Sequence, residues 1–481
     1  MFVLKLKKQS FLNYYFSDKV YVWEWILSSL VLLYILLSYN YVDTKSLTAW
    51  SVNLWDVIYD GKFKEFFSYT AENLHDVTHE YMGSDVISIL PMSVWNFPIW
   101  IAHRFFGKSV VKNSILMAWS KIGLMVFAYA TSYFVYKITS KLTDDKNAPK
   151  WAAILTFASA GMMTSVGFSG QNDIYFVFFA VLSVYCLICN KEWLFILFAA
   201  ISIAIKPFFL FAYIPLLLFL NKNIFIILIK VLGGLSLTIF NRLIFSSFPM
   251  YTESMSSGPS MLVLNNMFGI RQEVSQAPAS IFIIVWCVIC LYAYLKVPKN
   301  NESDKKYILF FTALTFVIIN CFSHIEHYRF VMTAPFLMIF AVLNKKYLRL
   351  NLILTFIYQF AYTAVLGIQN SMFLSNEFRA GTVIDKFTNL DISSPEYLNV
   401  FDFFIKTEYS VYVLPLVLCV AAVYVVAVIS VIIINSPIFN KKIELAETGV
   451  FEKYDHGILL LNCLSIVPIV VISQALAFLK I

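Results

Sequence analysis

The sequence predicts an all-α protein, a polytopic bundle of about thirteen transmembrane helices, and three observations support that prediction. Of the 481 residues, 60% are hydrophobic and only 14% are charged, whereas soluble domains average about 25% charged residues. Apolar runs long enough to cross much of a bilayer recur along the chain. The lysines gather in short loops between these runs, which is typical of cytoplasmic loops and argues against a nucleic-acid partner despite the net charge of +7.

The amino-terminal segment predicts a cytoplasmic arm followed by a retained first span. Residues 1–21 are rich in lysine, and Trp23 and Trp25 follow as an interfacial aromatic cluster. The apolar run 26–39 ends without the small-residue cleavage site of a signal peptide. We therefore expect the chain to emerge on the outer side, where Asp43 lies at the membrane boundary.

The first outer loop, residues 40–112, is predicted to contain interfacial helices. Apolar side chains recur at helical spacing from Leu47 to Ile58, and amphipathic helices of this kind lie in the interface. Residues 85–106 are apolar enough for a span, but prolines and Asn96 interrupt them. If this run does not cross fully, the later basic loops fall on the cytoplasmic side, as the positive-inside rule requires. We therefore expect a re-entrant or interfacial element there.

This topology places the amino terminus in the cytoplasm and the protein in the cell membrane as a multi-pass chain. Residues 1–481 are expected to form a single membrane domain, with further outer loops at 246–279 and 367–410. The expected spans are 22–39, 113–136, 151–168, 173–189, 193–205, 207–220, 224–245, 280–296, 307–322, 330–343, 350–366, 411–434 and 458–479.

Two histidines in the first outer loop, His75 and His79, raise a metal alternative. They are four residues apart, so on a helix they would face the same side and could ligate zinc. The zincin pattern has glutamate where this chain has Asp76, which disfavours metalloprotease chemistry. A polar interfacial loop or a substrate contact is the preferred interpretation, and no metal ligand is assigned.

A polar break at residues 169–173 separates two apolar runs and contains Gln171, Asn172 and Asp173. Both runs are long enough to cross most of a bilayer, so the break is expected near one membrane face. A carboxylate there is costly unless it faces a polar cavity, which indicates a functional site. The alternative is that Asp173 merely caps the next helix, because Asp and Asn are preferred caps.

Further charged residues are expected on the same outer face. Lys206 precedes Pro207 between two apolar runs, and segment 323–329 adds the candidate residues His324, Glu326, His327 and Arg329. Snorkelling of the lysine and simple pairing of the arginine with Glu326 are the alternatives. Acids and bases at a lipid boundary suit a substrate that is half lipid and half polar. Cations at headgroup depth can hold a phosphate, and a carboxylate can take a proton from an attacking hydroxyl.

The order of these features resembles the GT-C superfamily of membrane glycosyltransferases. Those enzymes carry an acidic residue just after the first span, and Asp43 matches it. Residues 170–173, Gly-Gln-Asn-Asp, resemble the G-Q-x-D motif of the bacterial, mannosyltransferase-like branches. Residues 204–207, Ala-Ile-Lys-Pro, resemble the A-x-K-P stretch that follows in those branches. Residues 324–329 are similar to an H-E-R-Y type of motif, with the order changed to His-Ile-Glu-His-Tyr-Arg.

The resemblance implies inverting transfer of a sugar from a polyprenyl-phosphate donor to a glycan or lipid-linked acceptor on the extracytoplasmic face. It implies Asp43 as catalytic base and Asp173 as a second catalytic residue that orients a substrate, with Lys206 and Arg329 on the donor phosphate. Substrate contacts are then expected from Gln171, Asn172, His324, Glu326, His327, His75 and His79. The D-x-D sequence has no clear counterpart, so no cofactor is expected and a divalent metal is not implied.

Two other classes stay open. A lipid-linked-glycan transporter would also place charges in a membrane cavity, but usually near the midplane and with internal repeats, which the sequence does not show convincingly. A cell-surface polysaccharide polymerase or ligase would share the carrier lipid and the outer face, and it would normally carry arginines in outer loops, as Arg271 and Arg379 do here. The polymerase differs from the proposed transferase in taking an oligosaccharide donor rather than a single sugar.

Overall fold

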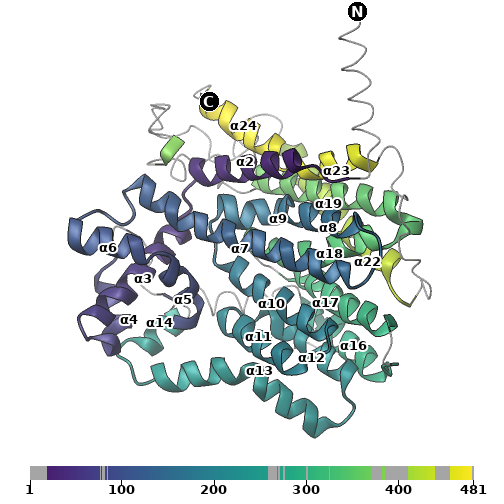
Figure 1. The fold of residues 1–481 in the computed structure, drawn as a ribbon, viewed down its shortest axis with the longest axis horizontal. Coiled ribbons are helices and arrows are strands. Elements are labelled where there is room, and N and C mark those ends of the chain that lie inside the picture. Colours follow the sequence, from purple (N-terminus) through teal and green to yellow (C-terminus); the bar gives the residue numbers. More distant parts are fainter. Residues whose placement is uncertain are drawn as a thin grey trace, which may run out of the picture.

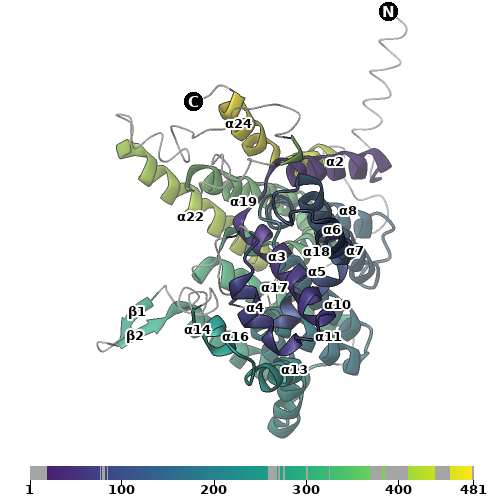
Figure 2. The same ribbon diagram turned by 90° about the vertical axis from the view of Figure 1, so that its left-hand side faces the viewer.

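The computed structural model describes residues 19–75, 77, 82–83, 85–257, 268, 271–274, 277–299, 302–323, 326–369, 382–384, 410–438 and 455–478. Almost all of this part of the chain is helical (Figures 1 and 2). Its one β structure is a short antiparallel hairpin, in which Arg271 pairs with Ser280 and Val274 pairs with Ala277. The all-α class expected from composition is therefore confirmed.

Local signals explain several helix boundaries. The Asn113 side chain accepts the backbone N–H of Ile115 at 3.1 Å and so starts α7, while Gly107, with φ +61°, ends α6. In chain order the elements are α2 (Val22–Ser38), α3 (Val42–Tyr59), η1 (Phe63–Glu65), α4 (Phe66–Glu72), α5 (Val86–Trp95), α6 (Phe97–Phe106), α7 (Ser114–Ser140), α8 (Ala148–Phe157), α9 (Ala160–Met162), η2 (Met163–Phe168), α10 (Asp173–Ile188), α11 (Glu192–Ile205), α12 (Phe208–Leu220), α13 (Ile224–Phe245), α14 (Tyr251–Ser257), β1 (Arg271–Val274), β2 (Ala277–Ser280), α16 (Ile281–Leu295), α17 (Glu302–Phe322), η3 (His327–Met332), α18 (Ala334–Leu343), η4 (Lys345–Tyr347), α19 (Leu348–Gln369), α22 (Ser410–Asn435), α23 (Asp455–Cys463) and α24 (Val467–Phe478).

The helices indicate a membrane protein, with fewer full-length spans than the thirteen expected. Six of the described helices are long and apolar enough to cross a membrane, or up to eight if each of two bent pairs is one span. The number of full-length spans is lower than expected because five further apolar helices have only 10–17 residues. α12, with 13 residues, rises about 20 Å, whereas a hydrocarbon core is about 30 Å thick.

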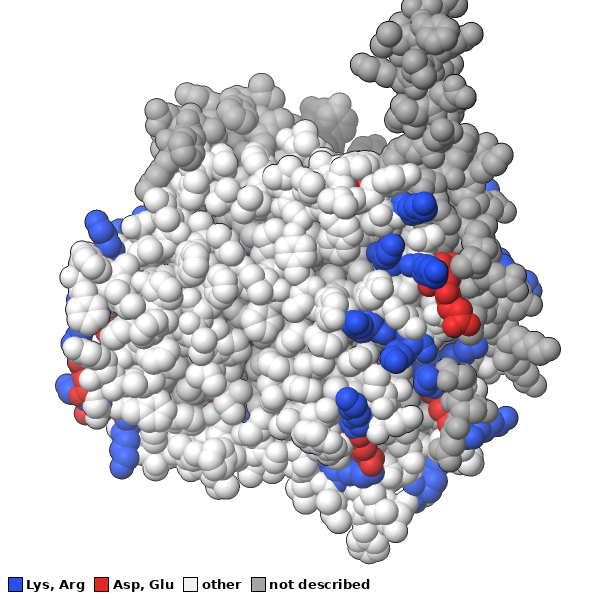
Figure 3. All heavy atoms as spheres, viewed as in Figure 1, with Lys and Arg blue, Asp and Glu red and all other residues white. Residues whose placement is uncertain are grey.

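A broad band of the surface seen in Figure 3 carries no charged side chains. In Figure 3 the lysine, arginine and acidic side chains gather toward the two sides of the view, and uncharged residues cover its middle. The exposed side chains of α7 include Trp119, Val126 and Tyr133. An uncharged band with exposed apolar side chains is the surface that a bilayer core requires.

Residues 40–112, expected to form the first outer loop, contain a group of helices, α3 to α6, that lies together at one side of the bundle (Figure 1). α3 packs against α4, α5 and α6. α2 and α3 meet at 81°, and α5 and α6 meet at 73°. The predicted interruption at Asn96 is thus confirmed as the bend between α5 and α6, in a segment of two short helices rather than one straight span.

The centre of the bundle is the segment of α8, α9 and η2, which is completely buried over its most apolar stretch. It packs against α7, α18 and η3. A Cβ at Gly161 would lie 2.9 Å from the carbonyl oxygen of Phe330, so the absence of a side chain lets α9 touch the backbone of η3. This contact brings residues 169–172, which follow η2, next to η3.

Candidate functional site

The polar break at residues 169–172 forms a tight turn that lies directly against α3. The preceding η2 is a π-helix, a rare form that is frequent at functional sites. Gly170 has φ +52°, and a Cβ there would lie 2.4 Å from Thr44 Oγ1. Glycine suits both the backbone conformation and the close approach. Beside it, Thr44 Oγ1 donates a hydrogen bond to the Ser169 carbonyl oxygen at 2.6 Å.

This contact brings Asp43 to the polar break. Gln171 Nε2 donates a hydrogen bond to Asp43 Oδ2 at 2.6 Å, across 128 positions of sequence. Gln171 is buried, whereas Asp43, in the first turn of α3, is partly exposed. Asn172 points elsewhere, because its Nδ2 donates to the Ser88 carbonyl oxygen of α5 at 3.3 Å.

Asp173, the first residue of α10, makes an ion pair rather than a helix cap. It is fully buried, and its Oδ2 accepts a hydrogen bond from Lys206 Nζ at 2.5 Å. Lys206 has an extended backbone because Pro207 disfavours helical geometry in the residue before it, and α11 ends at Ile205. The Lys-Pro break therefore frees the lysine from the helix and lets it face Asp173.

η3 adds a histidine and an arginine to the same region. His327 Nε2 lies 3.1 Å from Ser169 Oγ, within the polar break. The Arg329 guanidinium lies 5.1 Å from the ring centre of Phe208 and 5.5 Å from that of Tyr328. Lys206 Nζ lies 5.6 Å from the Tyr328 ring, so this tyrosine faces both cations.

These side chains form one electrostatic cluster. Asp173, Arg329 and Asp43 all act electrostatically on Lys206, and Asp43 and Arg329 act on His327. Within the described residues, the buried Nε of Arg329 has no hydrogen-bond partner. A buried guanidinium N–H is costly to leave unpaired, and a phosphate oxygen is a partner that suits it.

Exposure separates the roles that the two carboxylates can take. Asp43 is partly exposed and the Lys206 side chain keeps 18% of its surface, whereas Asp173 has none. A substrate approaching from outside can therefore reach Asp43 and Lys206. Asp173 can act on a substrate through Lys206, which it orients.

The structure does not bring every predicted site residue into this cluster. His75 lies near the other end of α3, where its Nε2 is 2.7 Å from Asn53 Oδ1. Glu326 is exposed at the start of η3 and acts electrostatically on Tyr328. His79 and His324 lie outside the described residues. The residues that the structure groups together are Asp43, Gln171, Asp173, Lys206, His327 and Arg329.

Two residues of the site were not predicted. Lys121 is fully buried in α7 and donates a hydrogen bond from Nζ to the Tyr39 carbonyl oxygen, at the bend just before α3. A lysine inside an apolar run is itself a signal of function, so its position could have indicated it. Tyr41, whose ring centre lies 5.9 Å from that of His327, gave no such signal.

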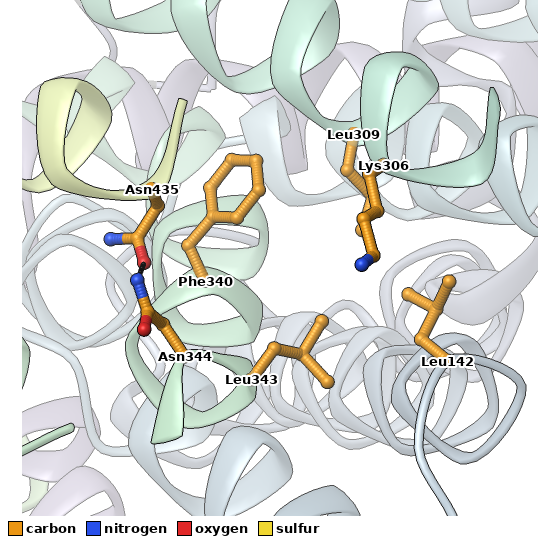
Figure 4. A pocket seen from close by; sticks show the side chains of 7 residues that line it. All are labelled: Leu142, Lys306, Leu309, Phe340, Leu343, Asn344 and Asn435. Atoms are coloured by element: carbon orange, nitrogen blue, oxygen red, sulfur yellow. Dashed lines mark hydrogen bonds between the residues drawn. The ribbon is translucent and has the colours of Figure 1, made fainter. Parts of the chain in front are cut away.

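A small pocket elsewhere in the bundle offers no alternative site. Its lining residues come from α17, α18 with the residue after it, α22 and the turn after α7, and Asn344 Nδ2 donates to Asn435 Oδ1 at 2.8 Å there (Figure 4). The side chains that line it are Leu142, Lys306, Leu309, Phe340, Leu343, Asn344 and Asn435. None of these is a carboxylate, so the pocket lacks a general base of the kind that Asp43 offers.

The candidate site is thus defined by its own contacts: a partly exposed carboxylate, a buried ion pair and a buried arginine around one polar turn. Comparison with known proteins adds no relative from which roles could be transferred. No protein family, curated protein or solved structure matches this chain.

Proposed function

We propose that this protein is an inverting membrane glycosyltransferase, which moves a sugar from a polyprenyl-phosphate donor to a hydroxyl of a glycan or lipid-linked acceptor. The observation that supports it best is the 2.6 Å hydrogen bond from Gln171 to Asp43. It joins the two acidic motifs of the GT-C resemblance, which are far apart in sequence. The corresponding fold is a GT-C-type bundle, in which short and bent helices complete the crossings that the six long helices do not provide.

In this proposal Asp43 is the general base. Its carboxylate accepts the proton of the acceptor hydroxyl while the hydroxyl oxygen bonds to the anomeric carbon of the sugar. The bond from that carbon to the phosphate oxygen breaks, and its electron pair leaves with the polyprenyl phosphate. Attack from the face opposite the phosphate inverts the anomeric centre. Gln171 fixes the orientation of the carboxylate through the hydrogen bond to Oδ2.

Lys206 and Arg329 hold the donor phosphate. Negative charge grows on the phosphate as the sugar leaves, and preorganised cations at that point are the largest share of such catalysis. Arg329 offers a planar fork of donors and Lys206 a compact charge, which Asp173 positions through the 2.5 Å ion pair. His327, with Ser169, completes the wall of the site.

The proposed orientation places the site on the extracytoplasmic face. α7 begins close to the helices of the first outer loop and ends at Ser140, where Lys137, Lys141, Lys146 and Lys150 surround the turn into α8. The positive-inside rule assigns this lysine-rich turn to the cytoplasm. The opposite end of α7, with α3 to α6, then faces outward.

The test is sugar transfer by the purified protein in lipid nanodiscs. Synthetic polyprenyl-phosphate donors, each carrying one labelled sugar, are offered with a mixture of envelope glycans and lipids as acceptors. We expect the parent protein to transfer label and Asp43→Asn to lose transfer by about 10²–10⁴-fold, the usual share of a general base. Donor binding, measured separately, should survive in Asp43→Asn because the phosphate contacts are kept.

Asp60→Asn is the matched control, since this carboxylate follows the other end of the same helix and pairs with Arg104. Transfer by this control should match the parent. A parent protein that binds no single-sugar donor would overturn the proposal in favour of an oligosaccharide donor or transport. Full activity in Asp43→Asn would remove the base assignment.

A further inference from the structure

We infer that Asp56, His75 and His103 form a zinc-binding site within the first outer loop, separate from the Asp43 cluster. One ligand atom from each of these residues lies within 4.8 Å of the other two. The residues come from α3, from the connection after α4 and from α6. Asp56 lies near the end of α3 and Asp43 in its first turn, which corresponds to a helix rise of about 20 Å.

The spacing of the three ligand atoms is close to that of a zinc site. Zinc bonds to histidine nitrogen and carboxylate oxygen are about 2.0–2.2 Å long, so two ligand atoms of a tetrahedral site are about 3.4 Å apart. No two of the three ligand atoms are more than 4.8 Å apart, so shifts of at most about 1.4 Å would bring them to this spacing. The His75 and His103 rings are already perpendicular, at 87°, with centres 4.8 Å apart. Small side-chain rotations therefore suffice to form the site.

The hydrogen bond of His75 selects the tautomer that a metal ligand needs. Asn53 Nδ2 donates to the Asn73 carbonyl oxygen at 2.9 Å, which leaves Asn53 Oδ1 as the atom facing His75. His75 Nε2 must then carry the proton that it donates to Oδ1 at 2.7 Å. Its lone pair lies on Nδ1. An outer partner that fixes the second ring nitrogen is a regular feature of metal-ligating histidines.

His103 is oriented in the same way. Its Nδ1 lies 2.9 Å from the Lys108 carbonyl oxygen, an acceptor, so this nitrogen carries the proton and the lone pair lies on Nε2. In the neutral form, each imidazole thus has its lone pair on the ring nitrogen opposite its acceptor. Two neutral imidazoles and a carboxylate are the ligand types of three-ligand zinc sites, in which water takes the fourth position.

The charge around Asp56 favours a cation. Asp56 is only 2% exposed; its Oδ1 accepts the indole N–H of Trp100 at 3.0 Å, and Arg104 is 3.8 Å away. Arg104 makes its shorter contact with Asp60, at 2.7 Å. Asp56 thus has only a long ion pair with an arginine that it shares with Asp60, and a metal ion would neutralise this buried carboxylate more closely.

The backbone of His75 shows that this residue is held in place. Its φ is +50°, a left-handed conformation that costs roughly 1–2 kcal/mol outside glycine. Strained residues of this kind persist where the surroundings fix them, often at ligand sites. α4 ends at Glu72 and His75 lies in the turn after it, so His75 is not on a helix, and His79 lies outside the described residues. The partner that the structure provides is His103.

Zinc content and binding test this site directly. Full-length protein in nanodiscs, stripped with a chelator and dialysed, is titrated with zinc by calorimetry and analysed by mass spectrometry of the metal. We expect about one zinc per chain, a visible absorption band of tetrahedral Co(II) when cobalt replaces zinc, and a higher Tm with metal. A stripped parent that binds no zinc, or a cobalt spectrum that is purely octahedral, would overturn the inference.

Variants identify the ligands. Asp56→Asn and His103→Gln should each weaken zinc binding more than about 100-fold, since even changes in outer partners cost 10–100-fold. Asn53→Ala should fall within that 10–100-fold range, because it removes the acceptor that sets the His75 tautomer. Their elution profiles and their Tm in chelator should match the parent, which separates loss of metal from loss of fold.

Two controls complete the set. Asp60→Asn removes a carboxylate that shares Arg104 with Asp56 but is not a ligand, and zinc binding should not change. His79→Gln should also leave binding unchanged. If His79→Gln abolishes binding while His103→Gln does not, the site is the sequence-local pair and the present assignment is wrong.

Discussion

The two ends of α3 carry two carboxylates in opposite surroundings. Asp43, in the first turn, is partly exposed and meets residues that arrive from the membrane bundle, beginning with Gln171. Asp56, near the last turn, is 2% exposed and contacts Trp100 of α6, a neighbour within residues 40–112. The comparison shows how one helix can serve two sites. Its start contacts the polar turn of the bundle, where we propose the transferase site, and its end lies at the inferred zinc site.

Replacing each of the two carboxylates with an amide, one at a time, should give the largest effects. It tests whether the two ends of α3 act independently. Asp43→Asn should reduce sugar transfer by about 10²–10⁴-fold and keep one zinc per chain. Asp56→Asn should lose zinc and keep most of the transfer rate. The measurements are labelled-sugar transfer and metal content of the same preparations. Loss of both properties in either variant would show that the two ends form one coupled site.

Removing the cation from an ion pair near each end of α3 compares a buried pair, Lys206 with Asp173, with an exposed pair, Arg104 with Asp60. Lys206→Ala leaves the fully buried Asp173 without its cation, which we expect to cost about 3–5 kcal/mol and to weaken donor binding. Adding Asp173→Asn should restore most of the stability but not the donor affinity. Arg104→Ala removes an exposed 2.7 Å pair with Asp60 and a longer, 3.8 Å contact with the buried Asp56, and it should cost less than Lys206→Ala, about 1 kcal/mol with zinc bound at Asp56. Thermal unfolding and donor titration measure these effects, and unchanged donor affinity in Lys206→Ala would remove its phosphate role.

Two glycines lie next to the two ends of α3. Substituting each of them distinguishes the stability cost of backbone strain from the cost of a steric clash. Gly170 and Gly61 have φ of +52° and +70°, but a Cβ would meet Thr44 at 2.4 Å in the first case and nothing within 4 Å in the second. Gly61→Ala should therefore cost roughly 1–2 kcal/mol, from the backbone alone. Gly170→Ala should cost a further 1–3 kcal/mol or so and lower transfer, because the turn is pushed from α3. Equal Tm values for the two variants would contradict the close packing of the turn.

Lys121→Met should have a smaller effect than Gly170→Ala. Lys121→Met keeps the length of the side chain but removes the hydrogen bond to the buried Tyr39 carbonyl oxygen, at a cost of about 1–3 kcal/mol. Because this contact supports the bend before Asp43, kcat should fall while zinc binding, at the far end of α3, should not change. A variant with parental kcat would limit Lys121 to a purely structural role.

The sequence predicted the membrane class, and it indicated the candidate residues around the start of α3 for local reasons. Asp43 and Asp173 each follow an apolar run, and Pro207 marks the break that exposes Lys206, so short patterns were enough to find them. Span number was less predictable, since hydropathy reports apolar length but not how far a 13-residue helix such as α12 extends across a membrane.

The cluster at the end of α3 could not be predicted from such patterns. Asp56 and His103 lie in segments with no motif of their own, and they meet because the α5–α6 bend folds α6 back onto α3. The spacing of His75 and His79 suggested a helical pair, but α4 ends before them. Tertiary contact, rather than spacing along the chain, selects the ligands.

The long sequence separation within the Asp43 cluster has a consequence for synthesis of the protein. Asp43 is synthesised before its partner Gln171, which lies 128 positions later. Ser169 is synthesised before its partner His327, which lies a further 158 positions along the chain. At about 5–20 residues per second, the ribosome needs roughly 15–60 s to supply the last partner. During that interval the contacts of Asp43 and Ser169 are not yet complete. Ribosome-bound chains that end before η3 should therefore be inactive and sensitive to protease at the outer loop, and a pause in translation after residue 173 would prolong that state.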